Sequence, residues 1–367
     1  PEEMAQRDAF DHVRLAASLS LATGRGYTHE NLPIETIEYS PDMGSLTLTL
    51  SDQVAWRCDL CNYEVTPCDG KPAPDHTVSK SPDGKWEAFC RDYDLFVKST
   101  ETGEEFRVTT DGQEGYHYAR PLESPIVAAG LLTGEQAAPW LTPAISWSKD
   151  SMKFLTFKID AREAGKCHLV QSVPLDGSKR PKLFSYIYPL PGDEKLPMAE
   201  PVIIDVEKKG LTRVAVEPVE FFYYGAPRLW GRWTDGARKD LLLVVRKRGS
   251  RVSTFYAVNP ETGEARQLFV ENAIAGGDVP EQHATDDGET IIWPSQRDGW
   301  THLYRFDVPG PEHAGGNDPG PFQITHGNWV AREIKHVDAQ SKTVYFTAGG
   351  KEPGIDPYYR LLYKVGF

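Results

Sequence analysis

Long apolar runs, cysteine and positive charge are all in short supply in this 367-residue chain. The longest apolar run covers only positions 126–132. A helix that spans a bilayer needs roughly 20 residues, so we expect no membrane segment. The cysteines number five, and an odd number excludes a complete set of internal disulfides. Lys and Arg number 40 against 53 Asp and Glu, and the net charge of −13 argues against a nucleic-acid partner.

The chain also lacks the sequence motifs of common catalytic sites. It contains no Gly-x-Ser-x-Gly nucleophile motif, no His-Glu-x-x-His zinc motif and no phosphate-binding glycine loop. A turn of the glycosidase propellers, Ser-x-Asp-x-Gly-x-Thr-Trp, is not matched either, because Asp83 directly precedes Gly84. We therefore expect no catalytic residue and no cofactor in this chain.

Three of the cysteines lie close together in the sequence. Cys58, Cys61 and Cys68 have the local spacing of a zinc knuckle, with His76 as the nearest imidazole. Structural zinc needs four ligands, and a second cysteine pair is missing. The spacing therefore favours ordinary strand and turn cysteines, and we predict no metal site.

What the chain does contain is a repeated strand-turn-strand phrase. Residues 93–98 are followed by Glu-Thr-Gly-Glu at 101–104, and residues 254–259 are followed by the same four residues at 261–264. Polar turns with Asp or Asp-Gly precede other short strands, at intervals of roughly 40 to 85 residues, where one propeller blade takes about 40 to 50. The pattern predicts an all-β fold, a seven- or eight-bladed β-propeller over residues 36–367.

A short helix is expected before the propeller, within a helix-and-linker segment at residues 1–30. Pro1 suits a first helical position, Glu2 favours the positive end of the helix dipole, and Gly24 is suited to end the helix. The apolar stripe is expected at Phe10, Val13, Ala17 and Leu21.

The most specific string is Trp-Pro-Ser-Gln-Arg-Asp-Gly-Trp-Thr-His-Leu-Tyr-Arg-Phe at residues 293–306. It reads as two strands around a turn at 297–299, and the segment 322–330 reads as the strand and turn that follow. These segments resemble the propeller of the dipeptidyl peptidase IV branch of the prolyl oligopeptidase family. The resemblance runs from about residue 40 to the end of the chain.

The resemblance implies both an architecture and a role. Members of that family pair an N-terminal, roughly eight-bladed propeller with a C-terminal α/β-hydrolase domain that holds the catalytic Ser, Asp and His. The chain starts at Pro1 and not at Met, so we expect a piece of a longer protein without its hydrolase domain. Its expected role is to gate access and position peptides for a serine exopeptidase. Its partners would be the peptide substrate and the hydrolase domain, and the resemblance favours a periplasmic or secreted location. The alternative is a free-standing propeller that scaffolds another protein.

The stretch from residue 113 to residue 143 interrupts the repeats and is expected to be a long functional loop. In the family, two adjacent glutamates from such an insertion bind the free amino terminus of the peptide. This chain departs from that pattern, because the stretch contains no Glu-Glu pair. Separated acids could hold the ammonium instead, and an arginine could bind a peptide carbonyl or carboxylate. The candidate residues are Glu114, Tyr116, Tyr118, Arg120, Glu123 and Glu135.

Overall fold

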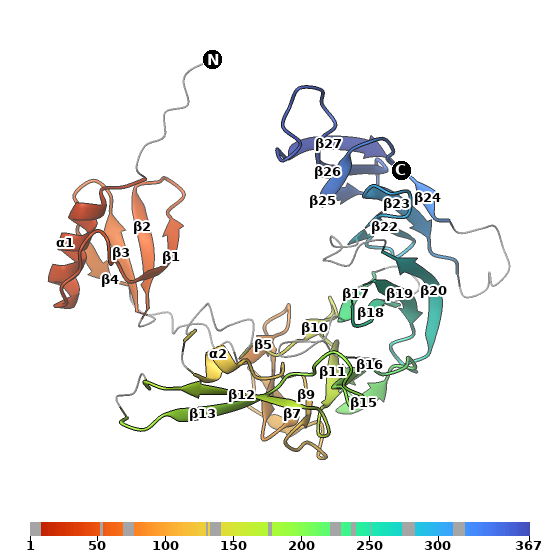
Figure 1. Cartoon of the computed structure of the whole chain (residues 1–367), viewed down its shortest axis with the longest axis horizontal. Coiled ribbons are helices and arrows are strands. Elements are labelled where there is room, and N and C mark those ends of the chain that lie inside the picture. The colour runs from red at the N-terminus through yellow and green to blue at the C-terminus, as the bar shows by residue number, and fades with distance from the viewer. Residues whose placement is uncertain are drawn as a thin grey trace.

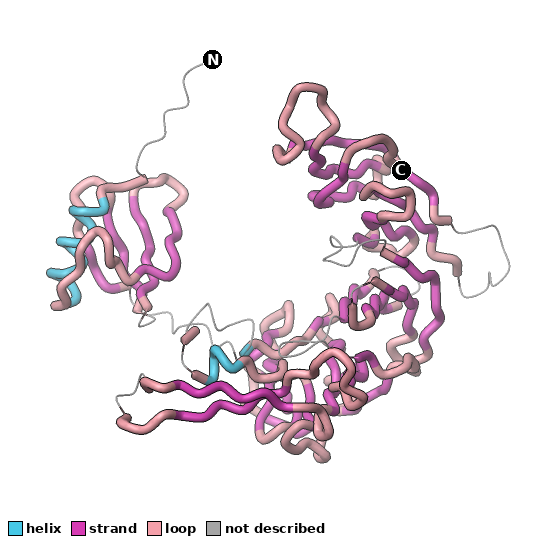
Figure 2. The backbone as a smooth tube through the Cα atoms, in the orientation of Figure 1, coloured by secondary structure: helices cyan, strands magenta, loops and turns pink. Residues whose placement is uncertain are grey.

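The computed structural model describes residues 9–51, 54–68, 77–129, 131–132, 141–174, 178–220, 229–235, 240–249, 251–273, 283–310 and 320–367. Within them the regular elements are almost all strands, with helices at α1 (His12–Thr23) and α2 (Pro125–Ala128) (Figure 2). Antiparallel sheets follow one another along the chain and around an arc, and the first and last sheets lie at its two ends (Figure 1).

The first two sheets each have four strands in sequence order. The first consists of β1 (Ile34–Tyr39), β2 (Ser45–Leu50), β3 (Ala55–Asp59) and β4 (Val65–Pro67). The second consists of β5 (Val78–Lys80), β6 (Trp86–Arg91), β7 (Asp94–Ser99) and β8 (Glu105–Arg107).

The third sheet is larger and is interrupted by a hairpin. Its main path is β10 (Ser146–Trp147), β11 (Lys153–Asp160), β14 (Met198–Asp205) and β15 (Gly210–Arg213). Two short strands are added to it: β9 (Tyr116–Tyr118) pairs with β11, and β16 (Val219–Glu220) pairs with β14. The hairpin consists of β12 (Lys166–Gln171) and β13 (Lys182–Ile187), which pair only with each other among the described strands.

Three more sheets complete the arc. The fourth consists of β17 (Leu229–Trp233), β18 (Leu241–Arg246), β19 (Val252–Val258) and β20 (Ala265–Asn272). The fifth consists of β21 (His283–Ala284), β22 (Thr290–Ser295), β23 (His302–Asp307) and β24 (Phe322–Gln323). The sixth consists of β25 (Val330–Asp338), β26 (Thr343–Gly349) and β27 (Leu361–Gly366).

This succession of antiparallel sheets is the all-β propeller architecture that the repeats predict. The described residues form six sheets of three or more strands, where turn spacing led us to expect seven or eight blades. In the longest interval between turns, the chain forms the β12–β13 hairpin as an insertion in the third sheet.

The same polar turn joins the first two strands of four sheets. In the second sheet, the Ser81 hydroxyl donates to Asp83 (2.6 Å) and accepts from the Trp86 backbone N–H (3.0 Å). Equivalent Ser or Thr hydroxyls at positions 40, 148 and 285 bond the Asp two residues later and the backbone N–H five residues later. These hydrogen bonds are local, which is why the turns can be recognised in the sequence.

The two Glu-Thr-Gly-Glu copies also form the same turn. The Gly103 N–H donates to the Ser99 carbonyl (2.9 Å), and the Gly263 N–H donates to the carbonyl four residues before it (2.8 Å). Both glycines are left-handed, with φ of 74° and 75°. A Cβ at Gly263 would in addition lie 2.0 Å from the Arg213 carbonyl oxygen. That copy therefore needs glycine for two reasons, the turn and the close approach.

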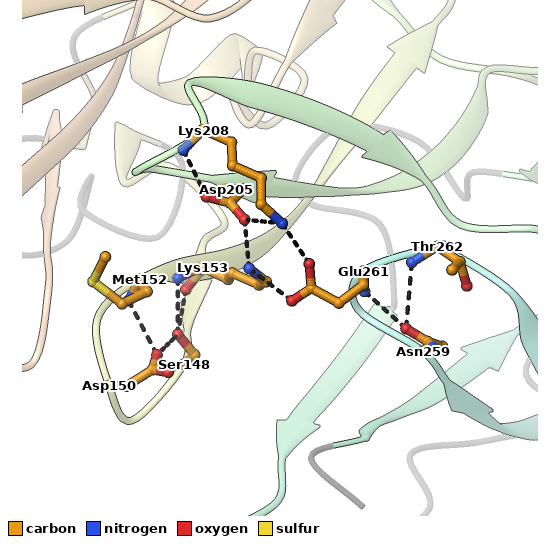
Figure 3. Close-up of polar contacts among 9 residues, drawn as sticks. All are labelled: Ser148, Asp150, Met152, Lys153, Asp205, Lys208, Asn259, Glu261 and Thr262. Carbon is orange, nitrogen blue, oxygen red and sulfur yellow. Dashed lines mark hydrogen bonds and ion pairs between the residues drawn. The ribbon is translucent and has the colours of Figure 1, made fainter.

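Adjacent lysines join these two turns to the third sheet. In the turn between β14 and β15, Lys209 pairs with Glu104 of the first copy (2.9 Å), and Lys208 pairs with Glu261 of the second (2.6 Å). Glu261 also pairs with Lys153 of β11 (3.0 Å), which is further bonded to Asp205 (2.5 Å) (Figure 3). The repeated turns therefore connect neighbouring sheets as well as neighbouring strands.

Apolar cores lie between consecutive sheets from the second sheet onward. Four buried clusters join β7 to β11, β11 to β18, β19 to β22, and β22 to β26. In the cluster between the fourth and fifth sheets, Phe255 and Trp293 have ring centroids 5.9 Å apart, and Phe306 is fully buried. These clusters hold the later sheets together through shared side chains.

The first sheet has a core of its own, covered by α1. Leu15 packs with Leu46 and Leu48 of β2, Cys58 of β3 and Tyr63. The helix α1 begins at His12, where the Asp11 side chain caps it by accepting from the N–H groups of the second and third helical residues (both 3.0 Å). Pro1 and Glu2, where the sequence suggested the start, lie outside the described residues. The helix ends at the left-handed Gly24, as predicted.

The predicted apolar stripe of this helix is wrong. Val13 and Leu21 are 62% and 87% exposed, and the helix buries Leu15, Ala16 and Leu19 instead. Both sets have helical spacing, so periodicity alone could not choose between them. The choice depends on which face of the helix meets the leucines of β2.

The cysteines are free thiols in separate environments. Cys58 is buried in β3, where desolvation raises the pKa of its thiol, whereas Cys61 is exposed and Cys68 is half-buried. His76 lies outside the described residues, and within those residues no three His, Cys, Asp or Glu side chains are grouped to hold a metal ion.

The described part of the chain contains no helix long and apolar enough to cross a membrane.

Candidate functional site

A cavity of about 370 Å³ lies where the loop before β9, the segment that leads into α2 and the base of the β12–β13 hairpin meet. It is lined by residues from distant parts of the sequence, as ligand sites commonly are. The polar lining residues from the loop side are Glu114, His117, Arg120 and Glu123. Those from the end of β11 through β13 are Arg162, Lys166, Ser185 and Tyr186.

A tight turn delivers the first of these residues to the cavity. The backbones of Gln113 and Tyr116 exchange two hydrogen bonds (2.7 and 2.8 Å) around Gly115, which has a φ of 74°. A Cβ at Gly115 would lie 3.3 Å from the Arg162 backbone. Glycine thus permits both the turn and the close approach. The turn leads into β9, a three-residue strand that pairs with β11.

Successive side chains of β9 point to opposite faces. Tyr116 lies under the Lys158 ammonium, 4.1 Å from ring centroid to Nζ, and Tyr118 donates its hydroxyl to Asp111 (2.8 Å). Burial and that hydrogen bond raise the pKa of Tyr118 well above its usual value. His117, between the two tyrosines, lines the cavity instead.

The structure therefore separates the predicted site residues into groups. Glu114, Arg120 and Glu123 line one cavity, whereas Tyr116 and Tyr118 do not line it. Glu135 lies outside the described residues. Whether the three cavity residues bind substrate stays a prediction.

Two of these three residues have unpaired charges within the described structure. Glu114 lies 3.5 Å from Lys166, and both side chains are largely exposed. Neither the Glu123 carboxylate nor the Arg120 guanidinium has an ion pair or side-chain hydrogen bond to another described residue. An unpaired carboxylate in a cavity can bind a ligand cation without first breaking an internal ion pair.

His117 was not predicted, and it is the most buried polar residue of the cavity, with 6% of its surface exposed. Its Nε2 lies 3.1 Å from the backbone oxygen of Arg120, and burial lowers the pKa of the imidazole to about 4. The ring is therefore neutral at pH 7. The Tyr-His-Tyr alternation would have placed His117 opposite the tyrosines, had the strand itself been recognised.

The β11–β13 side of the cavity brings charged and hydroxyl groups that the sequence did not indicate. Arg162 makes two hydrogen bonds with Asp160 (2.9 and 2.6 Å), so its charge is matched. Ser185 is hydrogen bonded to the Nδ1 of His168 across the hairpin (2.8 Å). Among the described residues no carboxylate bonds this imidazole, so the pair lacks the third member of a catalytic triad.

The sequence of the chain matches the family described as the dipeptidyl peptidase IV (DPP IV) N-terminal region, over residues 50–122 and 141–367. Its fold is similar to that of dipeptidyl peptidase 4 from Porphyromonas gingivalis (19% identity, TM-score 0.58), covering 90% of this chain and 44% of the other. It is also similar to a putative dipeptidyl aminopeptidase IV from Bacteroides ovatus (17% identity, TM-score 0.51), covering 92% and 45%.

The chain thus spans less than half the length of these two proteins, and at such identities the likeness concerns the fold. The family match takes in β3 and β4 of the first sheet, the second to sixth sheets, the cavity residues up to position 122 and the hairpin. Because the match covers well over half of the sequence, the chain belongs to the family of the dipeptidyl peptidase IV N-terminal region.

Proposed function

We propose that this chain is the substrate-gating and peptide-positioning domain of a dipeptidyl peptidase IV-like serine exopeptidase, and that it is not catalytic on its own. The observation that carries the proposal is the cavity that gathers Glu114, Arg120 and Glu123 from one interrupted stretch of the propeller. Family membership supports the assignment, because the structural relatives are a dipeptidyl peptidase and a putative dipeptidyl aminopeptidase.

The proposed chemistry is recognition of a peptide amino terminus. An ammonium group that leaves water needs carboxylate partners, and more than one partner also fixes its position. Glu123 is the principal acid in this proposal because its carboxylate is unpaired within the described structure, whereas Glu114 is near Lys166. Arg120, on the same cavity, is suited to bind a carbonyl further along the peptide.

Calorimetric titration of the 367-residue chain with Ala-Pro-Ala and with its N-acetylated form tests the binding role. The free peptide should bind more tightly, and Glu123→Gln should weaken its binding roughly five- to tenfold, as expected for loss of one charge-assisted contact. Glu194→Gln is the matched control, because Glu194 is also exposed but lines a different cavity. Equal binding of the two peptides would contradict the proposal.

The non-catalytic role has a separate test. Incubated with a Gly-Pro p-nitroanilide substrate, the purified chain should release no nitroaniline, and a fluorophosphonate probe should not label it. Turnover that serine-reactive inhibitors abolish would show a catalytic centre within the chain. The binding role would then be judged on the titrations alone.

A further inference from the structure

The imidazole of His117 has one nitrogen without a partner. Nδ1 is buried and has no hydrogen-bond partner within the described structure, and only 6% of the residue is exposed. The same ring lines the cavity that Glu114 and Glu123 line. Buried polar atoms of folded proteins nearly always have a partner, so an unpaired one beside a cavity points to a ligand atom.

The hydrogen bond of His117 Nε2 determines whether Nδ1 is a donor or an acceptor. Nε2 lies 3.1 Å from the carbonyl oxygen of Arg120. A carbonyl oxygen can only accept, so Nε2 carries the proton. A neutral imidazole has one N–H, so the unpaired Nδ1 carries a lone pair and can only accept a hydrogen bond.

Burial is the main reason why the ring stays neutral, since it disfavours the charged imidazole. The cation of Arg120, on the same segment, adds to this by disfavouring a second positive charge. From the end of β11 and from β12 the cavity receives Arg162 and Lys166, and from the turn before β9 it receives Glu114. Tyr93 faces the ring from the end of the β6–β7 turn, with centroids 6.4 Å apart.

We propose that Nδ1 of His117 accepts a hydrogen bond from the amino-terminal nitrogen of the bound peptide and so determines specificity for a primary amine. A primary ammonium has three N–H bonds, and Glu114, Glu123 and His117 can each supply an acceptor for one of them from the cavity lining. His117 thus complements two separated acids where the chain has no adjacent glutamates in this stretch. This inference rests on the proposed function of the cavity.

Two substitutions separate ligand binding from a structural role. His117→Gln can keep a donor near the Nε2 position for the Arg120 carbonyl but lacks the Nδ1 acceptor. His117→Asn can place an oxygen near the Nδ1 position but is too short to reach that carbonyl. A ligand contact and a purely structural contact therefore predict opposite orders of the two variants.

The probes are Ala-Pro-Ala, its N-acetylated form and its N-methylated form, titrated into the full chain. For His117→Gln we expect affinity for the free peptide to fall roughly five- to tenfold, with affinity for the acetylated peptide unchanged. His117→Asn should retain most of the preference for the free amine. If His117→Gln binds like the unsubstituted chain and His117→Asn loses the preference, the contact is structural and the inference is overturned.

A measurement on the unsubstituted chain makes the test independent of variant folding. The N-methylated peptide has one N–H fewer and should bind roughly fivefold more weakly than the primary amine. Equal affinities would overturn the inference while leaving the proposed function standing, provided that the acetylated peptide binds weakly. If free and acetylated peptides bind alike, the proposed function and this inference fail together.

Discussion

The first sheet and the later sheets cover their faces in different ways. In β2 the side chains of Leu46, Leu48 and Leu50 are buried, while Thr47 and Thr49 between them are only half-buried. In β18 every residue from Leu241 to Arg246 is buried. The first sheet buries one face under α1, whereas β11, β18 and β22 of the third to fifth sheets each contribute to buried clusters on both sides.

The difference is already present in the residue pattern. Ser-Leu-Thr-Leu-Thr-Leu in β2 alternates with period two, and Leu-Leu-Leu-Val-Val in β18 is continuously apolar. In the first sheet, α1 covers the buried face that a neighbouring sheet covers elsewhere. Among the described residues, the buried cluster under α1 accordingly contains side chains of the helix, of the first sheet and of its loops alone.

The largest expected effect comes from a shared core. Phe306→Ala removes a fully buried ring between the fourth and fifth sheets. It should lower the free energy of unfolding by about 3–5 kcal/mol, the usual cost of such a cavity. Hydrogen exchange should speed up in β17–β24 and stay unchanged in β1–β4. Phe322→Ala, at a 42% exposed ring, is the control. Equal loss of protection in the first sheet would remove the distinction between the two regions.

The reverse experiment destabilises the first sheet. Leu15 is fully buried against β2, whereas Leu21 is almost wholly exposed. Leu15→Ala should therefore cost about 2–5 kcal/mol in the local stability of α1 and β1–β4. Leu21→Ala should leave stability nearly unchanged, with an effect of at most about 0.5 kcal/mol. Hydrogen-exchange rates resolved by residue measure the stability change in both variants. A larger effect of Leu21→Ala would mean that the apolar stripe expected from periodicity is the buried face of α1.

These two leucines show what the sequence could and could not predict of the fold. The turns were predictable because their hydrogen bonds join residues that are close in sequence, as at Ser81 and Asp83. The buried face of α1 was not, because it is decided by contacts with β2, which follows only after a further strand. The turn spacing likewise did not show that the interval after β11 holds a hairpin, in which β12 pairs with β13 and with no other described strand.

The candidate site likewise contains residues that the sequence predicted and residues that it did not. Glu114, Arg120 and Glu123 were predicted from one interrupted stretch, and the structure places them on one cavity. His117 was missed because β9, a three-residue strand, is too short to show a period. The sequence therefore did not indicate which face of the strand carries the His117 side chain. Lys166 and Ser185 could not be predicted, since they reach the cavity through a hairpin that follows β11, far from the interrupted stretch in sequence.

Lowering the pH should destabilise the third sheet, which contains His117 in β9, and leave the first sheet unaffected. Its folded-state pKa is about 4 and the ordinary value is 6.5, so the unfolded chain takes up the proton more readily between these values. Stability is therefore lost as the pH falls between the two pKa values, by about 3 kcal/mol at most. His12 and His29, beside the first sheet, are exposed.

Urea unfolding of the unsubstituted chain and of His117→Gln, each at pH 7 and pH 4, measures this loss. The variant should lose less stability on acidification than the unsubstituted chain. Hydrogen exchange should place the difference in the third sheet, which contains β9, and leave β1–β4 unaffected. An identical pH dependence of the two proteins would mean that His117 does not resist protonation in the folded state.

The smallest expected effect concerns the repeated turns that connect the later sheets. Lys153 is only 16% exposed, and it keeps its second partner, Asp205, when Glu261 is neutralised. Glu261→Gln should therefore lower the free energy of unfolding by at most about 1 kcal/mol. Glu104→Gln should have no measurable effect, since Glu104 and Lys209 are both more than half exposed.

Denaturant midpoints at low and high salt measure this last pair of substitutions. Salt screens exposed charges far more than buried ones, so molar salt should reduce the Glu261 effect only in part. Equal effects of the two substitutions would mean that the shared sequence of the turns, and not the burial of their partners, sets their contribution to the array.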